Sequence, residues 1–579
     1  MKYWLALCIA LLLFALPAMA DDGVMRDDLT AVEVTRLMGN GTNLGNTMEA
    51  CDTSKMCWSD DPSVYEISWG QPKTTREMIQ GLKAAGFDTL RIPVAWMTNA
   101  TKLYPDGDYT INEAYLARVG EIVDWARDAG MYVIINDHWD GGWWGMFGSE
   151  NPDTVALAKE AYAGMWRQIA EYFRDYSDYV IFEGANEEIG ARFDENSKYC
   201  QDSVTTYLTD AQRYALTNEV NQLFVDTVRS TGGNNATRFL LIPGYGTNIA
   251  STCDSRFVMP KDSAEHKLLI SVHYYDPWSY CGASDAAGAT KWGTKQHMAD
   301  MISALSRMQQ FVSKGYGVVI GEYGALPGSD LVSKDNAAVY HQLFLDCCTA
   351  YDYTSCLWDT SGFFVRESLS FADEEMAQVY LNAKASESDQ AGALADMEAL
   401  QSEAPESFSE RIVSEGESVA WIMWNDGGWA LSYSVGDTYD PDSISPGIVA
   451  QDALITGQGT YTVSLDFTGT QQGYSASTAF CAVGLSNGEV NYPGYCIKIQ
   501  TIMINGERYS MKGRPYTTSD DGLCTRVNLF NEWVTKLPDT ARTPEGNTIA
   551  CSPTLINRND EVISHIETIS VTFEYVPGK

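Results

Sequence analysis

Two glutamates in this sequence stand where they could carry acid–base chemistry. Glu187 follows a short apolar run that ends at Phe182, and Glu322 follows another that ends at Ile320. Reactive groups of a barrel enzyme lie at the carboxyl ends of its strands, so two such glutamates can face one another. A facing pair can cleave a glycosidic bond, because one carboxyl protonates the departing oxygen while the other attacks the anomeric carbon. The two positions therefore indicate hydrolysis of a glycan.

The ends of other predicted strands carry further polar and aromatic side chains. Arg91 could keep an attacking carboxylate ionised through charge-assisted hydrogen bonds. His138, His273, Tyr275 and Trp358 each close a predicted strand. A lone histidine is more often a core residue, but two of the chain's 6 histidines fall at strand ends. We therefore treat these residues as candidates for contact with a substrate.

A tryptophan pair, Trp143 and Trp144, follows two glycines after the third predicted strand. Flat indole rings suit the faces of pyranose sugars, whereas core packing explains an isolated tryptophan about as often. We predict that this pair, Trp144 in particular, forms a wall of a substrate cleft.

Strand-then-helix units follow one another from residue 37 to residue 384. Their helical segments carry apolar residues at three-to-four spacing. The predicted strands are Leu37–Leu44, Thr89–Val94, Tyr132–Ile135, Tyr179–Phe182, Phe239–Ile242, Leu268–Val272, Val318–Ile320 and Ser355–Leu357. The predicted helices include Thr74–Ala85, Ala114–Ala129, Val155–Tyr176, Ala211–Ser230, Lys295–Ser313 and Asp335–Ala350. This alternation predicts an α/β fold, a (β/α)8 barrel, rather than an open doubly wound sheet, because no glycine-rich phosphate turn follows the first strand.

The pattern changes after residue 384. Residues 385–406 are acidic and rich in alanine and serine, as in a solvated helix or linker. From 407 to 579, short alternating runs separated by glycine, asparagine and aspartate predict a β-sandwich. This domain could be a carbohydrate-binding module or a structural support for the cleft. Its tryptophans would be sugar platforms in the first case and core side chains in the second: Trp421, Trp424, Trp429 and Trp533.

The N-terminal residues have the features of a secretory signal peptide. Lys2 precedes a short apolar run, and Ala18 to Ala20 form a small-x-small cleavage site. We expect residues 1–20 to be removed on export, leaving a catalytic domain over residues 21–384. The mature protein is then expected in the medium or in the periplasm.

The charge balance limits the partners. The chain has 39 Lys and Arg against 77 Asp and Glu, a formal net charge of −38. Nucleic acid and anionic membranes would be repelled, whereas a neutral polysaccharide would not. The charge therefore favours a neutral polysaccharide as the partner, and we expect a monomeric enzyme.

The cysteines predict disulfides rather than a metal site. Of the 13 cysteines, Cys8 falls in the predicted signal peptide, which leaves an even number in an exported chain. Cys51 and Cys57 could close a small loop. Two further bridges could form among Cys481, Cys496, Cys524 and Cys551. No C-x-x-C pair occurs, so a zinc site is not expected, and neither a metal nor an organic cofactor is needed.

Ordered motifs along the first domain resemble those of glycoside hydrolase family 5, the cellulase family A. The motifs lie at Gly41–Thr47, Trp69–Thr75, Ala84–Phe87 and Arg91–Pro93. They are similar to the branch called subfamily 4, which contains endoglucanases, xyloglucanases and broad-specificity enzymes. The resemblance covers about residues 35 to 384 and implies the (β/α)8 fold and hydrolysis of β-glycans.

The resemblance also implies a role for each matching residue. Glu187 would be the acid/base, and Asn186 before it would bind the sugar 2-hydroxyl. Glu322 would be the nucleophile, with Arg91 and Tyr275 around it.

The remaining matches concern the sugar subsite where the bond breaks. His138, His273 and Trp358 would line it, Trp358 as a platform beneath the ring, and Asn43 would contact the substrate. The chain departs from the branch at Trp139, where a second histidine is usual, which leaves the hydrogen bonding at that subsite open.

A retaining mechanism follows from this pairing. We expect an ionised Glu322, a Glu187 of raised pKa, and carboxyl groups about 5–5.5 Å apart. The preferred interpretation is an endo-β-1,4-glucanase. The alternatives are a xyloglucanase, xylanase or mannanase on the same fold, and a non-catalytic glycan-binding protein, which would have lost one of the glutamates.

Overall fold

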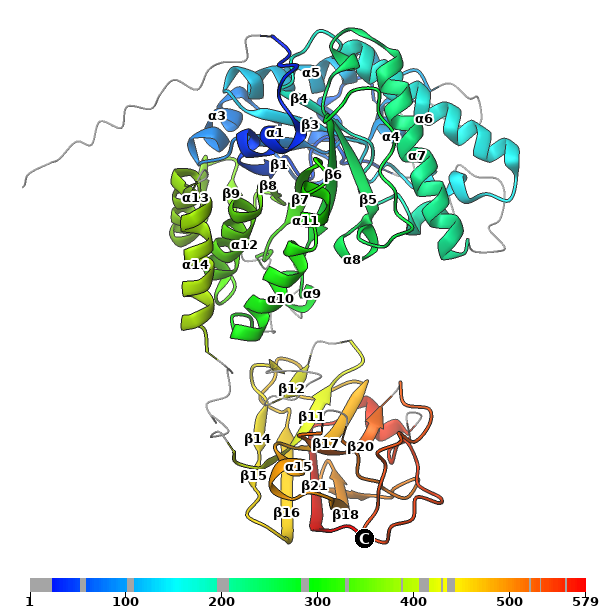
Figure 1. The fold of residues 1–579 in the computed structure, drawn as a ribbon, viewed down its shortest axis with the longest axis vertical. Helices are drawn as coiled ribbons and strands as arrows, with labels where there is room; N and C mark the ends of the chain where they lie inside the picture. Colours follow the sequence, from blue (N-terminus) through cyan, green and yellow to red (C-terminus); the bar gives the residue numbers. More distant parts are fainter. Residues whose placement is uncertain are drawn as a thin grey trace, which may run out of the picture. The chain divides into compact units, whose positions relative to one another are not determined.

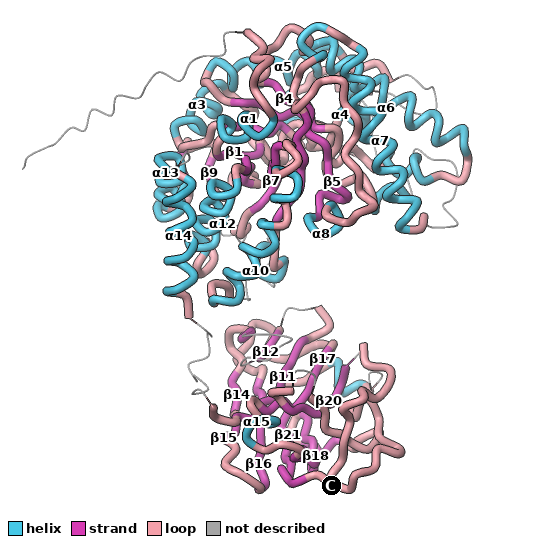
Figure 2. The backbone as a smooth tube through the Cα atoms, viewed as in Figure 1, coloured by secondary structure: helices cyan, strands magenta, loops and turns pink. Residues whose placement is uncertain are grey.

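The computed structural model describes residues 23–52, 59–101, 109–194, 208–282, 291–327, 333–386, 389–405, 416–428, 431–434, 443–519, 522–531, 533–557 and 560–579. The chain divides into two compact units, one with all eight strands of a barrel and the other with every strand from residue 419 onward. Figure 1 labels most of the elements, and Figure 2 colours the helices cyan, the strands magenta and the loops pink.

The first unit contains a closed barrel in which the strands follow one another in chain order from β1 to β8. Every neighbouring pair is parallel, including the pair β1 and β8 that closes the circle. The strands are β1 Asn40–Asn43, β2 Thr89–Ile92, β3 Tyr132–Ile135, β4 Val180–Glu183, β5 Leu240–Asn248, β6 Leu268–Tyr274, β7 Gly317–Tyr323 and β8 Tyr353–Leu357. The predicted barrel is therefore confirmed.

Helices alternate with these strands, as the three-to-four spacing predicted. The longer ones are α1 Ala31–Met38, α3 Arg76–Ala84, α5 Glu113–Asp128, α6 Pro152–Tyr172, α7 Asp210–Ser230, α10 Lys295–Ser306, α12 Ala337–Tyr351, α13 Glu374–Ser386 and α14 Gln390–Glu403. Short helical turns are α2 Ser63–Glu66, α4 Trp96–Ala100, η1 Trp143–Gly148, η2 Ala191–Asp194, η3 Gly233–Ala236, α8 Ile249–Thr252, α9 Trp278–Cys281 and α11 Gln309–Val312. Two short strands, β9 Phe364–Val365 and β10 Ser370–Phe371, form a hairpin after the barrel.

Two predicted boundaries were wrong. The run Leu37–Leu44 is not one strand, because a capping box between Thr30 and Glu33 starts helix α1, which extends to Met38. Gly39, with a φ of 54°, ends that helix, and β1 follows. The predicted helix Lys295–Ser313 is likewise divided into α10 and α11.

Helix α1 contributes to the barrel's inner core. Its Val34 and Met38 join a buried cluster with Ile134, Leu269 and Val319 from three different strands. Because these strands lie around the circle, their clustered side chains fill the barrel interior, and Val319 marks the inward face of β7.

The second unit contains two antiparallel sheets. A six-stranded sheet has the order β13-β12-β11-β17-β20 with β15 paired to β11, and a five-stranded sheet has the order β14-β16-β21-β18-β19. Their strands are β11 Val419–Asn425, β12 Ser432–Ser434, β13 Ser443–Ile444, β14 Val449–Gln451, β15 Ala453–Leu454, β16 Gly459–Asp466, β17 Phe480–Leu485, β18 Tyr495–Ile504, β19 Glu507–Tyr509, β20 Thr525–Asn531 and β21 Thr568–Pro577. The turns α15 Gly488–Asn491 and η5 Glu561–Ser564 lie between them. One apolar core joins side chains of both sheets, such as Trp424, Val483 and Phe573. The predicted all-β region is confirmed.

The cysteines described in this region do not form the two predicted disulfides. Cys481, Cys496 and Cys551 carry reduced thiols. Cys481 is fully buried in the apolar core, where it acts as a small hydrophobic side chain. The predicted partner of Cys51, Cys57, lies outside the described residues, as does Trp429. None of the described helices is both long and apolar enough to cross a membrane.

Candidate active site

The barrel brings Glu187 and Glu322 together at the carboxyl ends of its strands. Glu322 is the penultimate residue of β7, and Glu187 follows β4 after three intervening residues. The Glu322 side chain is 8% exposed, whereas that of Glu187 is 39% exposed. One carboxylate is therefore enclosed by protein, and the other opens toward solvent.

Arg91 on β2 lies at the centre of a fully buried hydrogen-bond network. Its Nε donates to Glu183 Oε2 at 2.7 Å, and its Nη2 donates to Asn186 Oδ1 at 2.8 Å. Its Nη1 donates both to Asn43 Oδ1 at 2.9 Å and to Glu322 Oε1 at 3.0 Å. The planar guanidinium thus fixes the Glu322 carboxylate relative to three strands and supplies a positive charge beside it.

Glu183 is the anchor of this network and was missed by the sequence analysis. It is fully buried at the end of β4, with Ser271 Oγ donating to its Oε1 at 2.6 Å and Asn136 Nδ2 donating to its Oε2 at 3.1 Å. Paired with Arg91, the carboxylate is satisfied at both oxygens. The only available signal was a third glutamate at a strand end beside the predicted acid/base.

A bulge in β7 sets the position of Glu322. Ile320 pairs with Val272, but the next pair is His273 with Glu322, so Gly321 is an additional residue in β7. The register with β8 shifts at the same place. A Cβ on Gly321 would lie 2.9 Å from Ser271 Oγ and 3.2 Å from His273 Nε2, so only glycine fits without displacement. The bulge places the Glu322 carboxylate directly opposite the His273 ring.

His273 joins the two glutamates. Its Nδ1 donates to Glu187 Oε1 at 2.8 Å and lies 3.6 Å from Glu322 Oε2. One oxygen of each glutamate and a ring nitrogen all lie within 4.8 Å of one another. The described groups that could accept a metal ion are these same three residues.

The environment moves the three pKa values in different directions. Burial raises the pKa of Glu322 above its usual value, and the charges of His273 and Arg91 offset this only in part. For Glu187, burial favours a higher pKa, but the hydrogen bond from His273 together with the charges of His273, Arg192 and Arg91 outweighs it, so the pKa is lowered. Burial also opposes the charge on His273, yet the two carboxylates raise its pKa. The expectation of a raised Glu187 pKa is therefore wrong for the ligand-free structure, because the cationic groups around Glu187 favour its ionised form.

His138 and Trp358 form a second part of the site, and His138 lies beside Glu322. Their rings stack with centroids 5.5 Å apart and planes inclined by 8°. His138 Nδ1 lies 3.4 Å from Asn136 Nδ2, which can only donate, so the ring hydrogen belongs on Nε2, 3.9 Å from Glu322 Oε1. Burial and the nearby Arg91 charge hold the pKa of His138 well below its usual value. A neutral His138 therefore presents an N–H toward the nucleophile candidate.

Two predicted substrate contacts need correction. Asn43 is 1% exposed, and its amide donates to the Gly321 carbonyl oxygen at 2.9 Å while accepting from Arg91, so it holds the network rather than a sugar. Trp144 is also 1% exposed, and its Nε1 donates to Asp137 Oδ2 at 3.1 Å. Because its ring packs on Phe147, it belongs to the core and cannot form an exposed wall of the cleft.

Other predicted residues keep their places at strand ends. Asn186 follows β4 directly before Glu187, and its amide oxygen is engaged by Arg91. Tyr275 follows β6, where its ring meets Trp278 edge-on at 5.9 Å. The roles inferred for Asn186 and Tyr275 toward a sugar stay predictions.

Trp139 occupies the loop after β3 in an unusual conformation. Its φ is 47°, in the left-handed region, and its side chain is 46% exposed. The backbone N–H donates to Glu188 Oε1 at 2.7 Å, and the ring lies 4.3 Å from the Arg192 guanidinium. An exposed indole therefore stands where a second histidine was expected, so this position offers a stacking surface instead of a ring nitrogen.

Eight parallel strands closed into a barrel, with a glutamate pair clamped at their carboxyl ends, define a glycoside hydrolase of the (β/α)8 class. The chain belongs to the cellulase family, glycosyl hydrolase family 5, whose family model matches residues 50–363.

Relatives and solved structures agree with this family. Endoglucanase A of Paenibacillus barcinonensis is 35% identical over 363 residues, which are 58% of this chain and 83% of that protein. A xyloglucan-specific endo-beta-1,4-glucanase of Bacteroides ovatus is 35% identical over 329 residues, 54% of this chain and 61% of the relative. The structure of a family 5 lichenase from Caldicellulosiruptor sp. F32 in complex with cellotetraose has a TM-score of 0.53 at 30% identity and covers 62% of this chain and 96% of that one.

Proposed function

We propose that this protein is a secreted endo-β-1,4-glucanase that cleaves internal bonds of β-glucans with retention of configuration. The observation that carries the proposal is the approach of Glu187 and Glu322 oxygens to within 4.8 Å. Retaining enzymes separate these carboxyl groups by about 5–5.5 Å, and inverting enzymes by about 6.5–9.5 Å to admit a water molecule. The short separation supports direct attack on the sugar.

The first step follows from the geometry. A Glu322 oxygen forms a bond to the anomeric carbon as the glycosidic C–O bond breaks, and Glu187 gives its proton to the departing oxygen. In the second step Glu187 takes a proton from water, the water oxygen bonds to the anomeric carbon, and the bond to Glu322 breaks. Both carboxyl groups end in the state in which they began.

The hydrogen bond between His273 and Glu187 can supply the proton for the first step. Without substrate, the pKa shifts favour a proton on His273 and an ionised Glu187. A bound glycan would exclude water from Glu187, and desolvation favours the neutral forms of both groups. The proton then moves along the 2.8 Å hydrogen bond from Nδ1 to Oε1, so that Glu187 becomes the acid only when substrate is present.

The names of the relatives support the substrate class. They include endoglucanases, a lichenase with bound cellotetraose and a xyloglucan-specific enzyme. A β-1,4-linked glucan is the chemistry these share, so we infer it as the substrate. Xyloglucan is a second candidate, because a relative that covers most of the barrel acts on it. The predicted signal peptide at residues 1–20 supports secretion, with the medium or the periplasm as the destination.

Product analysis on a panel of polymers tests the proposal. We expect reducing-sugar release from soluble β-glucans and xyloglucan that exceeds release from xylan and mannan, with the β-anomer appearing first by proton NMR. Glu322→Gln should remove this activity. Initial formation of the α-anomer, or full activity of Glu322→Gln, would overturn the retaining assignment.

A further inference from the structure

The six-stranded sheet of the second unit has one face in the core and one that lines a cavity. Side chains alternate along its strands, so Trp424 on β11 and Leu529 on β20 point into the apolar core. The side chains of Met423, Asn425 and Asn528 belong to the opposite face. This second face combines apolar side chains, those of Met423 and Phe480, with the amides of Asn425 and Asn528.

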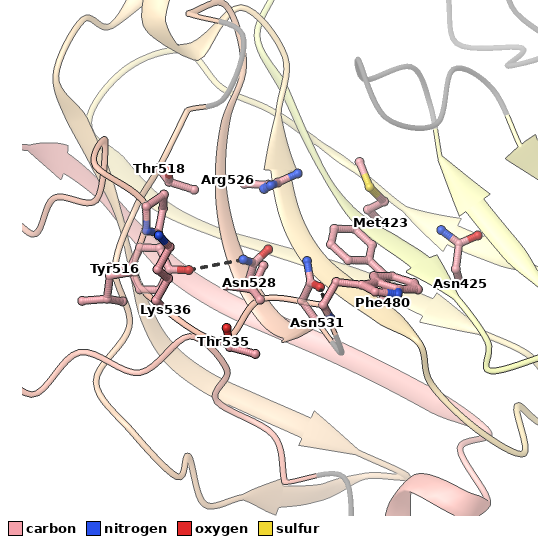
Figure 3. A pocket seen from close by; sticks show the side chains of 14 residues that line it. Met423, Asn425, Phe480, Tyr516, Thr518, Arg526, Asn528, Asn531, Thr535 and Lys536 are labelled. Carbon is pink, nitrogen blue, oxygen red and sulfur yellow. Dashed lines mark hydrogen bonds between the residues drawn. The ribbon is translucent and has the colours of Figure 1, made fainter. Parts of the chain in front are cut away.

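The cavity on this face has a volume of about 630 Å³. Strands β11, β17 and β20 form its floor, and the segments around Tyr516 and 533–538 border it (Figure 3). Ligand sites of small molecules and short oligomers occupy about 300–1,000 Å³. The cavity is therefore large enough for part of a glycan chain.

Asn528 provides a polar group that the protein leaves unsatisfied. It is 2% exposed, and its Nδ2 donates to the Tyr516 hydroxyl at 3.3 Å. Its Oδ1 has no hydrogen-bond partner among the described residues. In Figure 3 the amide lies between Tyr516 and Asn531 on the cavity floor. A buried amide without a partner destabilises the fold, so this atom points to a ligand that donates a hydrogen bond there.

Trp533 provides an aromatic surface at the border of the cavity. It is 55% exposed, whereas Trp421 and Trp424 are fully buried. Among the described tryptophans that the sequence offered as sugar platforms, only Trp533 is therefore exposed enough to stack on the ring of a bound sugar. A half-exposed indole beside amide groups combines stacking with hydrogen bonding, which is the chemistry that a pyranose ring offers in return.

We propose that this cavity binds a segment of a neutral β-linked glycan, with Trp533 stacking on one sugar and Asn528 accepting a hydrogen bond from a hydroxyl group. The choice of a β-glucan as the ligand rests on the proposed function of the barrel. Asn425 and Asn531 add further amides to the cavity wall, and amide groups can hydrogen-bond to the hydroxyl groups of a sugar. The pocket makes the second unit a binding module with a defined site.

Calorimetric titration of the full-length protein with cellohexaose tests this site. In a Glu322→Gln background, which cannot hydrolyse the ligand, we expect two molecules of cellohexaose per chain, one in the barrel and one in the cavity. Trp533→Ala should reduce this to one, and Asn528→Ala should weaken the second site at least tenfold. Ile549→Ala, a change at a 79% exposed side chain outside the cavity lining, should leave both sites intact.

The outcomes separate the site from the barrel's function. In a protein that retains Glu322, the Trp533→Ala variant should hydrolyse a small soluble cello-oligosaccharide at the same rate as the unsubstituted protein. The proposal would be overturned if Trp533→Ala and Asn528→Ala both still bound two molecules of cellohexaose per chain. It would also be overturned if the Glu322→Gln protein bound only one. A circular dichroism melt shows whether Asn528→Ala is folded, and Trp533→Ala tests the same site from an exposed position. Loss of hydrolysis on every glucan would instead contradict the proposed function.

Discussion

At the scale of single residues, the acid and the nucleophile differ in their exposure to solvent and in the positively charged group that each contacts. Glu187 is the open member of the pair and contacts His273, whereas Glu322 is enclosed and paired with Arg91. Each carboxylate should therefore respond differently to substitution, to pH and to the loss of its cationic partner.

Replacement of Glu187 by glutamine should remove general acid catalysis. We expect kcat on cellulosic substrates to fall about 10²–10⁴-fold. An aryl glycoside with a good leaving group needs little protonation, so its glycosylation step should fall much less. Steady-state kinetics on both substrates measure the difference, with Glu171→Gln on the exposed face of α6 as the matched control. Equal losses on the two substrates would argue against an acid role.

The acid limb of the pH profile should report Glu322. The nucleophile must be ionised, and burial raises its pKa above the usual 4.5. Activity is then present above that raised pKa and is lost as the pH falls through it. We expect the acid limb of kcat/KM to lie above pH 4.5. A profile that stays flat down to that value would contradict the environment described for Glu322.

Arg91→Lys tests whether the guanidinium fork is needed or only its charge. Lysine keeps the positive charge but cannot reach Glu183, Asn186 and Glu322 together. Charged hydrogen bonds contribute about 1.5–3 kcal/mol each, so we expect kcat to fall about tenfold or more. The acid limb should also move to higher pH, since a less well placed cation stabilises ionised Glu322 less. A fall in activity with an unchanged pH profile would assign Arg91 a purely structural role.

At the scale of elements, the bulge at Gly321 links the register of β7 to the site. Gly321→Ala would bring a methyl group to 2.9 Å from Ser271 Oγ, the hydroxyl that holds Glu183. We expect kcat to fall at least tenfold while the circular dichroism spectrum keeps its barrel signature. Gly428→Ala, where the nearest atom would lie 3.7 Å away, is the control. Full activity of Gly321→Ala would show that the close packing is not required.

The barrel could be predicted from sequence because its strands are short apolar runs between amphipathic helices, and the two glutamates could be predicted because they end two of those runs. Burial could not be predicted in the same way. Trp139 and Trp144 are the same amino acid and lie close together in the sequence, yet Trp144 is enclosed by aromatic rings and Trp139 is exposed. Glu183 was missed, and Asn43 was given the wrong role, because the roles of both depend on contacts with Arg91 across the barrel.

At the scale of the whole molecule, two compact units with separate apolar cores should unfold separately. We expect two transitions in differential scanning calorimetry. Trp424→Ala removes a fully buried ring that packs 5.1 Å from Phe467 and should cost about 3–5 kcal/mol. Only one transition should move to lower temperature. A shift of both transitions together would indicate that the units unfold as one.

The additional residue in β7 has a consequence for how such a barrel can change over evolutionary time. Inward and outward positions alternate along a regular strand, so with Val319 facing inward, Gly321 would also face inward and Glu322 would turn toward the surrounding helices. The bulge reverses that alternation only for the last residues of the strand, those after Gly321. An insertion or deletion of one amino acid upstream in β7 would therefore turn Glu322 away from the site and abolish activity, although every catalytic side chain would still be present.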